Sequence, residues 1–209
     1  EDYGKTRLKP QQLLDLFSFA RNTRINLTET LRKIIFKGKD DLQTTEDINA
    51  LKPQVELLIK EYQSQKMRQQ NLDYDDLLLV VANRLNKDEE ARQILAKAYD
   101  HILIDEMQDT NPLQWYLLKP FEHICNLFCV GDDAQSIYSF RGADFKNVHL
   151  FTERIKDSEI KVLDKNYRST QEILDISNWL LETSPINYNK KLTASRGPGK
   201  LPTILNVAN

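Results

Sequence analysis

The stretch HILIDEMQDTN, residues 101–111, decides the fold class of this chain. It is a short apolar run that ends in two adjacent carboxylates, Asp105 and Glu106. Two similar runs follow, LFCVGD at 127–132 and IKVLDKN at 160–166, with helix-like segments between them. Short apolar strands that alternate with helices indicate a parallel α/β sheet. Because such sheets bind ligands at the carboxyl ends of their strands, the polar residues at these ends predict a site.

The half of the chain before this stretch predicts helices and no strand. An Asn26/Glu29 capping box starts one predicted helix, and Gly38 breaks it. Pro53 is predicted to lie in the first turn of the next helix. An all-helical segment therefore precedes the predicted sheet.

The last part of the chain predicts one more helix and one more strand. The helix is expected from Thr170 to Leu181, where apolar residues recur with helical spacing. The strand-like run TILNV follows at 203–207. The C-terminal segment is therefore expected to continue the α/β pattern.

The composition is that of an ordinary globular protein. The 209 residues are 40% hydrophobic and 29% charged, with no apolar run near the roughly 20 residues of a membrane span. The N-terminal sequence has no secretory core, so the cytoplasm is the predicted compartment. Cys125 and Cys129 lack a paired ligand motif and are predicted to be reduced thiols. With a net charge of −2, any nucleic-acid site must come from a local patch.

The adjacent carboxylates Asp105 and Glu106 form the first candidate site. One of them can hold Mg²⁺ while the other positions or deprotonates a water, which is the division of labour that phosphoryl transfer requires. The alternative is an acidic N-cap region before a helix at Pro112.

The segment VGDDAQSIYSFRGAD, residues 130–144, forms the second candidate site. Gln135 can hydrogen-bond a phosphate or a water. Tyr138, Phe140 and Arg141 offer stacking faces and a cation for single-stranded nucleic acid. For Tyr138, ordinary packing is the alternative.

The segment LDKNYRST, residues 163–170, forms the third candidate site at another strand end. Arg168 can reach a phosphate with two hydrogen bonds, and Tyr167 can stack on a base. A solvated arginine at a helix start is the alternative.

Together these segments resemble the superfamily 1 DNA helicases of the UvrD, Rep and PcrA type. DEMQDTN resembles helicase motif II, GDDAQSIYSFRGAD resembles motif III, and NYRS resembles motif IV. NLDYDDLL at 71–78 is similar to the segment that precedes motif II in this family. The resemblance is strong over residues 71–170 and weak before them.

The resemblance implies a nucleotide site for ATP and Mg²⁺. Asp105 would bind Mg²⁺, and Glu106 would activate the attacking water. Gln135 would sense the γ-phosphate, Tyr167 would stack on adenine, and Arg168 would contact the γ-phosphate from a neighbouring domain.

The resemblance also implies a track for DNA. Tyr138, Phe140 and Arg141 would line the path of single-stranded DNA, and the partners would be single strands and single-strand/double-strand junctions. The implied activity is that of an ATP-dependent 3′-to-5′ DNA helicase in repair or replication.

By the same resemblance the fold is a partial RecA-like P-loop NTPase with a parallel sheet, preceded by an all-helical subdomain. Residues 1–72 would be the helical 1B-like subdomain, 73–160 the C-terminal half of RecA-like domain 1A, and 161–209 the start of domain 2A. Such a partial sheet would have an open edge, through which we expect two copies to associate.

The phosphate-binding sequence GxxxxGK[ST] is absent from these 209 residues. Gly4-Lys5-Thr6 is rejected as a remnant, because Pro10 follows too soon for the helix that this loop must open. The chain is therefore expected to be a helicase fragment that hydrolyses no ATP by itself. Two alternatives stay open: a noncatalytic single-stranded-DNA-binding or partner-docking module, and an α/β domain without a ligand.

Overall fold

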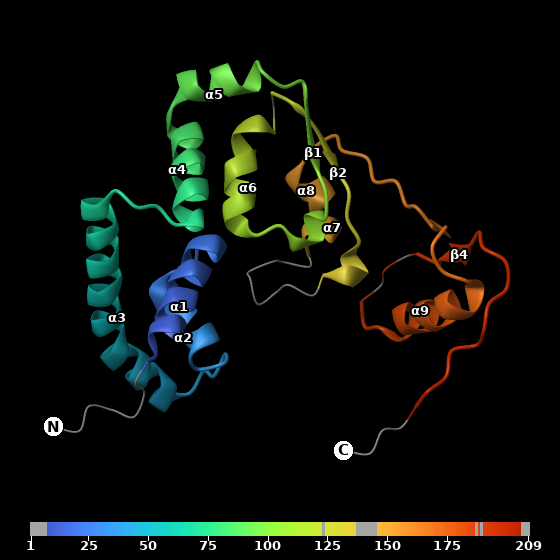
Figure 1. Ribbon diagram of the computed structural model, residues 1–209, viewed down its shortest axis with the longest axis horizontal. Coiled ribbons are helices and arrows are strands. Elements are labelled where there is room, and N and C mark those ends of the chain that lie inside the picture. The colour runs from blue at the N-terminus through green and yellow to red at the C-terminus, as the bar shows by residue number, and fades with distance from the viewer. Residues whose placement is uncertain (1–7, 123, 137–145, 187, 189, 206–209) are drawn as a thin grey trace. The chain divides into compact units, whose positions relative to one another are not determined.

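The computed structural model divides the chain into two compact units (Figure 1). The first unit comprises residues 1–132 and 136–148, and the second comprises residues 133–135 and 149–209. The structure describes residues 8–122, 124–136, 146–186, 188 and 190–205. The predicted three-part division at residues 72 and 160 stays a prediction.

Helices make up most of the first unit. Its elements, with the short helix α7 at its end, are α1 (Pro10–Thr23), α2 (Leu27–Ile34), α3 (Leu42–Gln69), α4 (Tyr74–Lys87), α5 (Glu89–Ala96), β1 (His101–Ile104), η1 (Met107–Asp109), α6 (Pro112–Leu118), η2 (Lys119–Phe121), β2 (Asn126–Cys129) and α7 (Lys146–His149). Within the described ranges, no helix combines the length and the apolar character that a membrane crossing requires.

Local signals in the sequence fix most of the helix ends. The Asn26 side chain accepts a hydrogen bond from the backbone N–H of Glu29, as the sequence predicts for the start of α2. Gly38, with φ of 79°, lies in the left-handed region just after α2, where a side chain would be strained. Asp41 caps α3 by accepting from the Thr44 N–H.

The predicted position of Pro53 is wrong. Pro53 lies inside α3, which begins at Leu42, and not in its first turn. A proline inside a helix costs about 3 kcal/mol. Ile48 and Val55, on either side of it, are both buried, and each fully buried side chain of this kind contributes about 1.5–3 kcal/mol. Burial on both sides offsets the lost hydrogen bond, so the helix continues.

Two apolar clusters hold the first unit together. One joins the first three helices through Leu16, Leu31, Ile48 and Val55. The other joins α4, α5, η2 and the segment just before β2 through Leu85, Ala96, Phe121 and Cys125. Figure 1 shows α6 alongside α4, with α5 crossing above them. The helices thus build the scaffold that the strands adjoin.

Strands β1 and β2 form a parallel pair, which confirms the predicted parallel α/β character of this region. The register pairs His101 with Asn126 and Ile104 with Cys129. The strands therefore end side by side, and the polar residues that follow each strand are brought to one edge.

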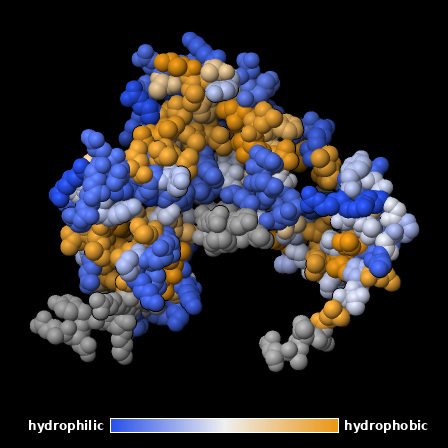
Figure 2. All heavy atoms as spheres, viewed as in Figure 1, coloured by the Kyte–Doolittle hydropathy of each residue, from blue (hydrophilic) through white to orange (hydrophobic). Residues whose placement is uncertain are grey.

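Apolar side chains lie exposed on the strand pair and on the helices beside it. Leu103 on β1 is 73% exposed and Phe128 on β2 is 62% exposed. Further exposed apolar side chains lie on α4 and α5, where Figure 2 shows hydrophobic surface: Tyr74, Leu77, Val80, Val81 and Ile94. Patches of this kind mark surfaces suited to association.

The second unit contains α8 (Phe151–Arg154), β3 (Lys165–Asn166), α9 (Gln171–Thr183) and β4 (Thr193–Ala194). The helix predicted from Thr170 to Leu181 is confirmed as α9. Strands β3 and β4 pair in parallel. Asn178 of α9 fixes β4, because its side chain donates to the Leu192 carbonyl and accepts from the Leu192 N–H.

Of the two strands predicted in the second unit, one is much shorter than predicted, and the other is not a strand over its described residues. In IKVLDKN, only Lys165–Asn166 is a strand, and residues 203–205 of TILNV are not strand. Leu163 is exposed, and the ladder that does form joins β3 to Thr193–Ala194. A strand needs a hydrogen-bonded neighbour as well as apolar residues, and periodicity in one segment cannot supply that neighbour.

A cluster of charged side chains joins α1, α3 and the start of α4. Arg21, only 10% exposed, is bonded to Asp73 at 3.0 Å, to Asp75 at 2.9 Å and to Asp76 at 2.7 Å. Lys66 is bonded to Asp73 and Asp76. This charge cluster ties α1 to α3 and α4, whose residues in the cluster lie 45 or more positions after Arg21.

The cluster also shifts the pKa values of two of its members, Asp73 and Lys66. Partial burial by itself would raise the pKa of Asp73, but hydrogen bonds from Arg21 and Lys66 outweigh it and hold that pKa well below its ordinary value. Partial burial by itself would lower the pKa of Lys66, but its hydrogen bonds to Asp73 and Asp76 raise it. The stability gained from the lowered pKa of Asp73 is present above the unfolded pKa and is lost as the pH falls.

We predict that Arg21→Met lowers the free energy of unfolding by about 3–5 kcal/mol, because it leaves three carboxylates without their shared cation. Urea unfolding at pH 7 measures the change. The loss should shrink as the pH falls below about 4, because the unfolded chain then binds a proton at Asp73 that the folded protein, with the lowered pKa of Asp73, takes up only at lower pH.

The matched control is Arg84→Met, which removes an arginine that is 70% exposed and forms an ion pair with Asp88, four residues away. This change should cost less than about 1 kcal/mol. Equal losses for the two variants, or a loss for Arg21→Met that does not depend on pH, would contradict the proposed cluster energetics.

Candidate functional site

The hydrogen-bond ladder of β1 and β2 continues beyond the strands. The Val130 N–H donates to the Ile104 carbonyl at 2.8 Å, and the Met107 N–H donates to the Val130 carbonyl at 2.9 Å. These bonds place the segment after β1 directly beside the segment after β2. The edge predicted to hold the site is therefore formed by residues 105–108 and 130–132.

The two predicted catalytic carboxylates lie exposed at this edge. Asp105 accepts a hydrogen bond from the Glu106 N–H through Oδ1 at 2.9 Å. Glu106 has φ of 50° and ψ of 43°, a left-handed conformation that costs a non-glycine residue about 1–3 kcal/mol. Strained residues of this kind cluster at functional sites, where the surrounding structure holds them in place.

Gln108 connects the two segments of the edge. Its side chain is 1% exposed. Its Nε2 donates to Oε2 of Glu106 at 2.7 Å, and its Oε1 accepts from the Asp132 N–H at 3.0 Å. The carboxylate of Glu106 is thus joined through one buried amide to the backbone after β2.

Gly131 occupies a position where no side chain fits. A Cβ built there would lie 2.7 Å from Oε1 of Gln108 and 2.8 Å from Cγ of Met107. The glycine allows the backbone after β2 to approach Gln108 closely enough for the bond to Asp132.

Further buried polar contacts hold the end of the same turn. Asn147 donates to the Thr110 carbonyl at 2.6 Å and accepts from the Trp115 indole at 3.0 Å. Asn111 caps α6 and donates to the Asn22 side chain of α1 at 2.9 Å. The turn after β1 is therefore held by α1, by α7 and by the segment after β2.

Sequence reasoning missed Gln108 and Asn147 as parts of the site. Both are buried amide side chains, and the sequence signal was only that Gln108 stands two residues after Glu106. Their partners, Asp132 and Thr110, are 24 and 37 residues away. No local pattern specifies contacts over such separations.

The other predicted site residues belong to the second unit or lie outside the described residues. Gln135 is exposed at the end of η3 (Asp133–Gln135). Tyr167 is exposed after β3, and the N–H of Arg168 donates to Oδ1 of Asn166. The carbonyl of Arg168 accepts from Arg196. The predicted DNA-contacting residues lie outside the described residues: Tyr138, Phe140 and Arg141.

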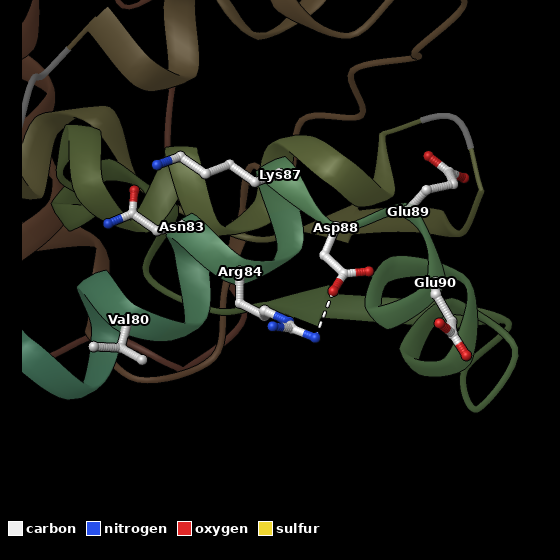
Figure 3. Close-up of a pocket in the computed structure, with 7 residues that line it drawn as sticks. All are labelled: Val80, Asn83, Arg84, Lys87, Asp88, Glu89 and Glu90. Atoms are coloured by element: carbon white, nitrogen blue, oxygen red, sulfur yellow. Dashed lines mark ion pairs between the residues drawn. The ribbon is translucent and has the colours of Figure 1, made fainter.

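A shallow pocket lies elsewhere on the first unit, between α4 and α5 (Figure 3). Its lining includes the ion pair between Arg84 and Asp88, together with Val80, Asn83, Lys87, Glu89 and Glu90. None of the predicted site residues lines it. We base the candidate site on the strand ends, where the predicted carboxylates Asp105 and Glu106 lie.

The edge has the oxygen ligands that Mg²⁺ prefers. Asp105 and Glu106 present exposed carboxylates, and Mg²⁺ in phosphoryl-transfer sites is commonly bound by one or two carboxylates, substrate phosphates and water. Among the residues that the structure describes, no group of three or more His, Cys, Asp and Glu side chains could hold a metal. Two carboxylates of this kind fit a metal that substrate phosphates and water also coordinate.

Asp105 and Glu106 lie at the carboxyl ends of a parallel strand pair, which is where α/β sheets bind their ligands. Residues 2–156 match the family described as UvrD/REP helicase N-terminal domain. The chain belongs to this family.

Curated relatives with assigned names support the same family. A probable DNA helicase II homologue of Mycoplasma capricolum subsp. capricolum is 34% identical over 178 residues, which cover 81% of this chain and 25% of that protein. The ATP-dependent DNA helicase PcrA of Staphylococcus epidermidis is 36% identical over 170 residues, covering 78% and 23%. PcrA of Bacillus subtilis is 30% identical over 194 residues, covering 92% and 24%. The chain spans about a quarter of the length of these curated relatives.

We predict that Gly131→Ala disrupts the edge, because the new Cβ must displace Gln108 and Met107. The variant should lose about 1–3 kcal/mol of stability, as overpacked sites do. Its Asp132 N–H should exchange faster with solvent in a hydrogen-exchange experiment.

Gly197→Ala is the control, since a Cβ at residue 197 meets nothing within 4 Å. The close-packing account would be wrong if the two alanine variants had the same stability and the same exchange at Asp132.

Proposed function

We propose that this chain is part of an ATP-dependent DNA helicase that couples ATP hydrolysis to 3′-to-5′ movement along single-stranded DNA. The observation that carries the proposal is the pair Asp105 and Glu106 at the end of β1, beside the end of β2, in a member of the UvrD/REP family. The names of the relatives, which are ATP-dependent DNA helicases, support ATP and DNA as the ligands.

The proposed nucleotide chemistry is divided among five residues. Asp105 would hold Mg²⁺, which supplies charge neutralisation at the phosphates when it is bound. Glu106 would accept a proton from the attacking water, and its exposure at the edge leaves it accessible to that water. Gln135 would contact the γ-phosphate, Tyr167 would stack on the adenine, and Arg168 would neutralise γ-phosphate charge.

The proposed DNA track consists of Tyr138, Phe140 and Arg141. Aromatic faces stack on bases of any sequence, and arginine adds attraction for the backbone and for base faces. A track of this composition suits single strands, and a helicase would meet single-strand/double-strand junctions as it moves. Repair or replication in the cytoplasm is the setting that we propose for the whole protein.

The proposed fold of the whole motor is RecA-like. The parallel β1–β2 pair followed by site residues supports this assignment. Self-association, which we expect at an open edge of this sheet, also stays a proposal, and the exposed Leu103 and Phe128 leave apolar surface on the strand pair for a second copy.

We predict that the 209-residue chain hydrolyses no ATP by itself, because it contains no GxxxxGK[ST] sequence. In a longer protein that contains this chain, Glu106→Gln should lower DNA-stimulated ATP hydrolysis by about 10²–10⁴-fold, the usual effect of losing a general base. A coupled phosphate-release assay measures ATP hydrolysis by the 209-residue chain and by the longer protein with and without Glu106→Gln.

Glu46→Gln on the exposed side of α3 is the matched control and should hydrolyse ATP like the unmodified protein. A longer protein without any ATPase activity would support the alternative of a noncatalytic DNA-binding or docking module. Hydrolysis by the purified chain would contradict the first part of the prediction.

We predict that the chain binds labelled oligo-dT and that the double substitution Phe140→Ala, Arg141→Ala weakens this binding. Each lost stacked base costs about 1–3 kcal/mol, which is about 5- to 150-fold in affinity. Fluorescence anisotropy at several salt concentrations measures the effect, and binding should weaken as salt rises.

Tyr74→Ala, Arg84→Ala is the control for this experiment, because it removes an exposed aromatic side chain and an exposed cation from α4. Equal affinity of the two double variants would rule out Phe140 and Arg141 as the DNA track of this chain.

A further inference from the structure

We propose that Gln108 is a positioning residue that holds the Glu106 carboxylate and transmits changes at this carboxylate to the backbone after β2. The inference deepens the proposed function and rests on it, because it concerns how the proposed catalytic base is held. Gln108 touches neither nucleotide nor DNA in this account. It acts through Glu106 on one side and through Asp132 on the other.

The orientation of the Gln108 amide is set by its two partners. Nε2 faces Oε2 of Glu106, which is an acceptor, and Oε1 faces the Asp132 N–H, which is a donor. A flipped amide would place two acceptors together at Glu106 and two donors together at Asp132. The two hydrogen bonds therefore fix one orientation of the amide.

Gln108 has no room to move alone. Its side chain is 1% exposed, and Oε1 lies 2.7 Å from the position that a Cβ on residue 131 would occupy. The Ser136 hydroxyl also donates to the Gln108 carbonyl at 3.4 Å. In such close packing, a shift of the Gln108 amide must be accompanied by a shift of Gly131 and Asp132.

Glu106 is the part of this arrangement that a reaction would change. Its backbone is held at φ of 50°, and Gln108 is the side chain that binds its carboxylate. When the Glu106 carboxylate moves, its hydrogen bond with Nε2 of Gln108 changes. Because Oε1 of the same amide accepts from the Asp132 N–H, the change reaches the backbone after β2.

The test uses amide NMR of the 209-residue chain with neither ATP nor DNA present. Glu106→Gln, which removes the charge, should change the chemical shift of the Asp132 amide. The same substitution made in a Gln108→Met background should change it by less than half as much. Gln108→Met should also raise the exchange rate of the Asp132 N–H about five-fold, as loss of one hydrogen bond does.

A swap of the two residues distinguishes transmission from simple packing. Gln108→Glu places two carboxylates together and should disturb the Asp132 amide. The double substitution Glu106→Gln, Gln108→Glu reverses donor and acceptor in that bond and should restore slow exchange at Asp132. The signal of the buried Trp115 indole reports whether Gln108→Met folds. If it does not fold, the swap still tests the proposal.

Asp105→Asn is the control for charge alone, because Asp105 is bonded to the Glu106 N–H and not to Gln108. Its effect on Asp132 should be the same with and without Gln108→Met. The proposal is overturned if Glu106→Gln changes the Asp132 amide equally in both backgrounds, or if the swap restores nothing. Either result would contradict the role of Gln108 without contradicting the proposed helicase function. A longer protein that hydrolyses no ATP would contradict the proposed function without changing the contacts of Gln108.

Discussion

The parallel pairing of β1 with β2 is the constraint on which the site depends. Its register places the ends of both strands at one edge, and two further hydrogen bonds through Val130 extend the pairing past the strands. This extension places the segment after β2 beside Asp105 and Glu106. Without it, Glu106 would be an exposed residue in a left-handed turn with no adjoining segment to hold it.

Buried amide side chains give this edge a single arrangement. Gln108 and Asn147 each satisfy a donor and an acceptor on different segments. A buried amide without its partners costs about 1–3 kcal/mol, so alternative registers that separate these pairs are disfavoured. Apolar packing by itself tolerates small shifts, whereas paired amides do not. The polar contacts therefore define the geometry, and the clusters around Leu16 and Leu85 stabilise it.

The charge cluster around Arg21 links the helical part to this edge. Asn22, the next residue on α1, bonds both Asp75 of the cluster and Asn111 at the start of α6. A continuous set of polar contacts thus runs from α4 through α1 to the turn after β1. In the helicase that we propose, this connection would keep the helical segment and the nucleotide edge in one fixed orientation within the first unit.

The sequence by itself determined the elements whose signals are local. The cap at Asn26, the strands HILI and NLFC, and the carboxylates after β1 were all predictable, since caps, apolar runs and strand ends depend on neighbouring residues. The motifs also indicated the family. Pro53 was misplaced because burial on both sides of it outweighs its local preference for a helix start.

The tertiary structure alone decided which strands pair and which side chains bind one another. IKVLDKN has the composition of a strand, yet only Lys165–Asn166 forms a ladder, with Thr193–Ala194. A strand requires a neighbouring strand, and its own sequence does not specify which segment that is. The same reason hid the role of Gln108, whose partner Asp132 lies 24 residues away. The sequence placed the two carboxylates that we propose as catalytic at a strand end, and the contact between two strand ends determined what holds them there.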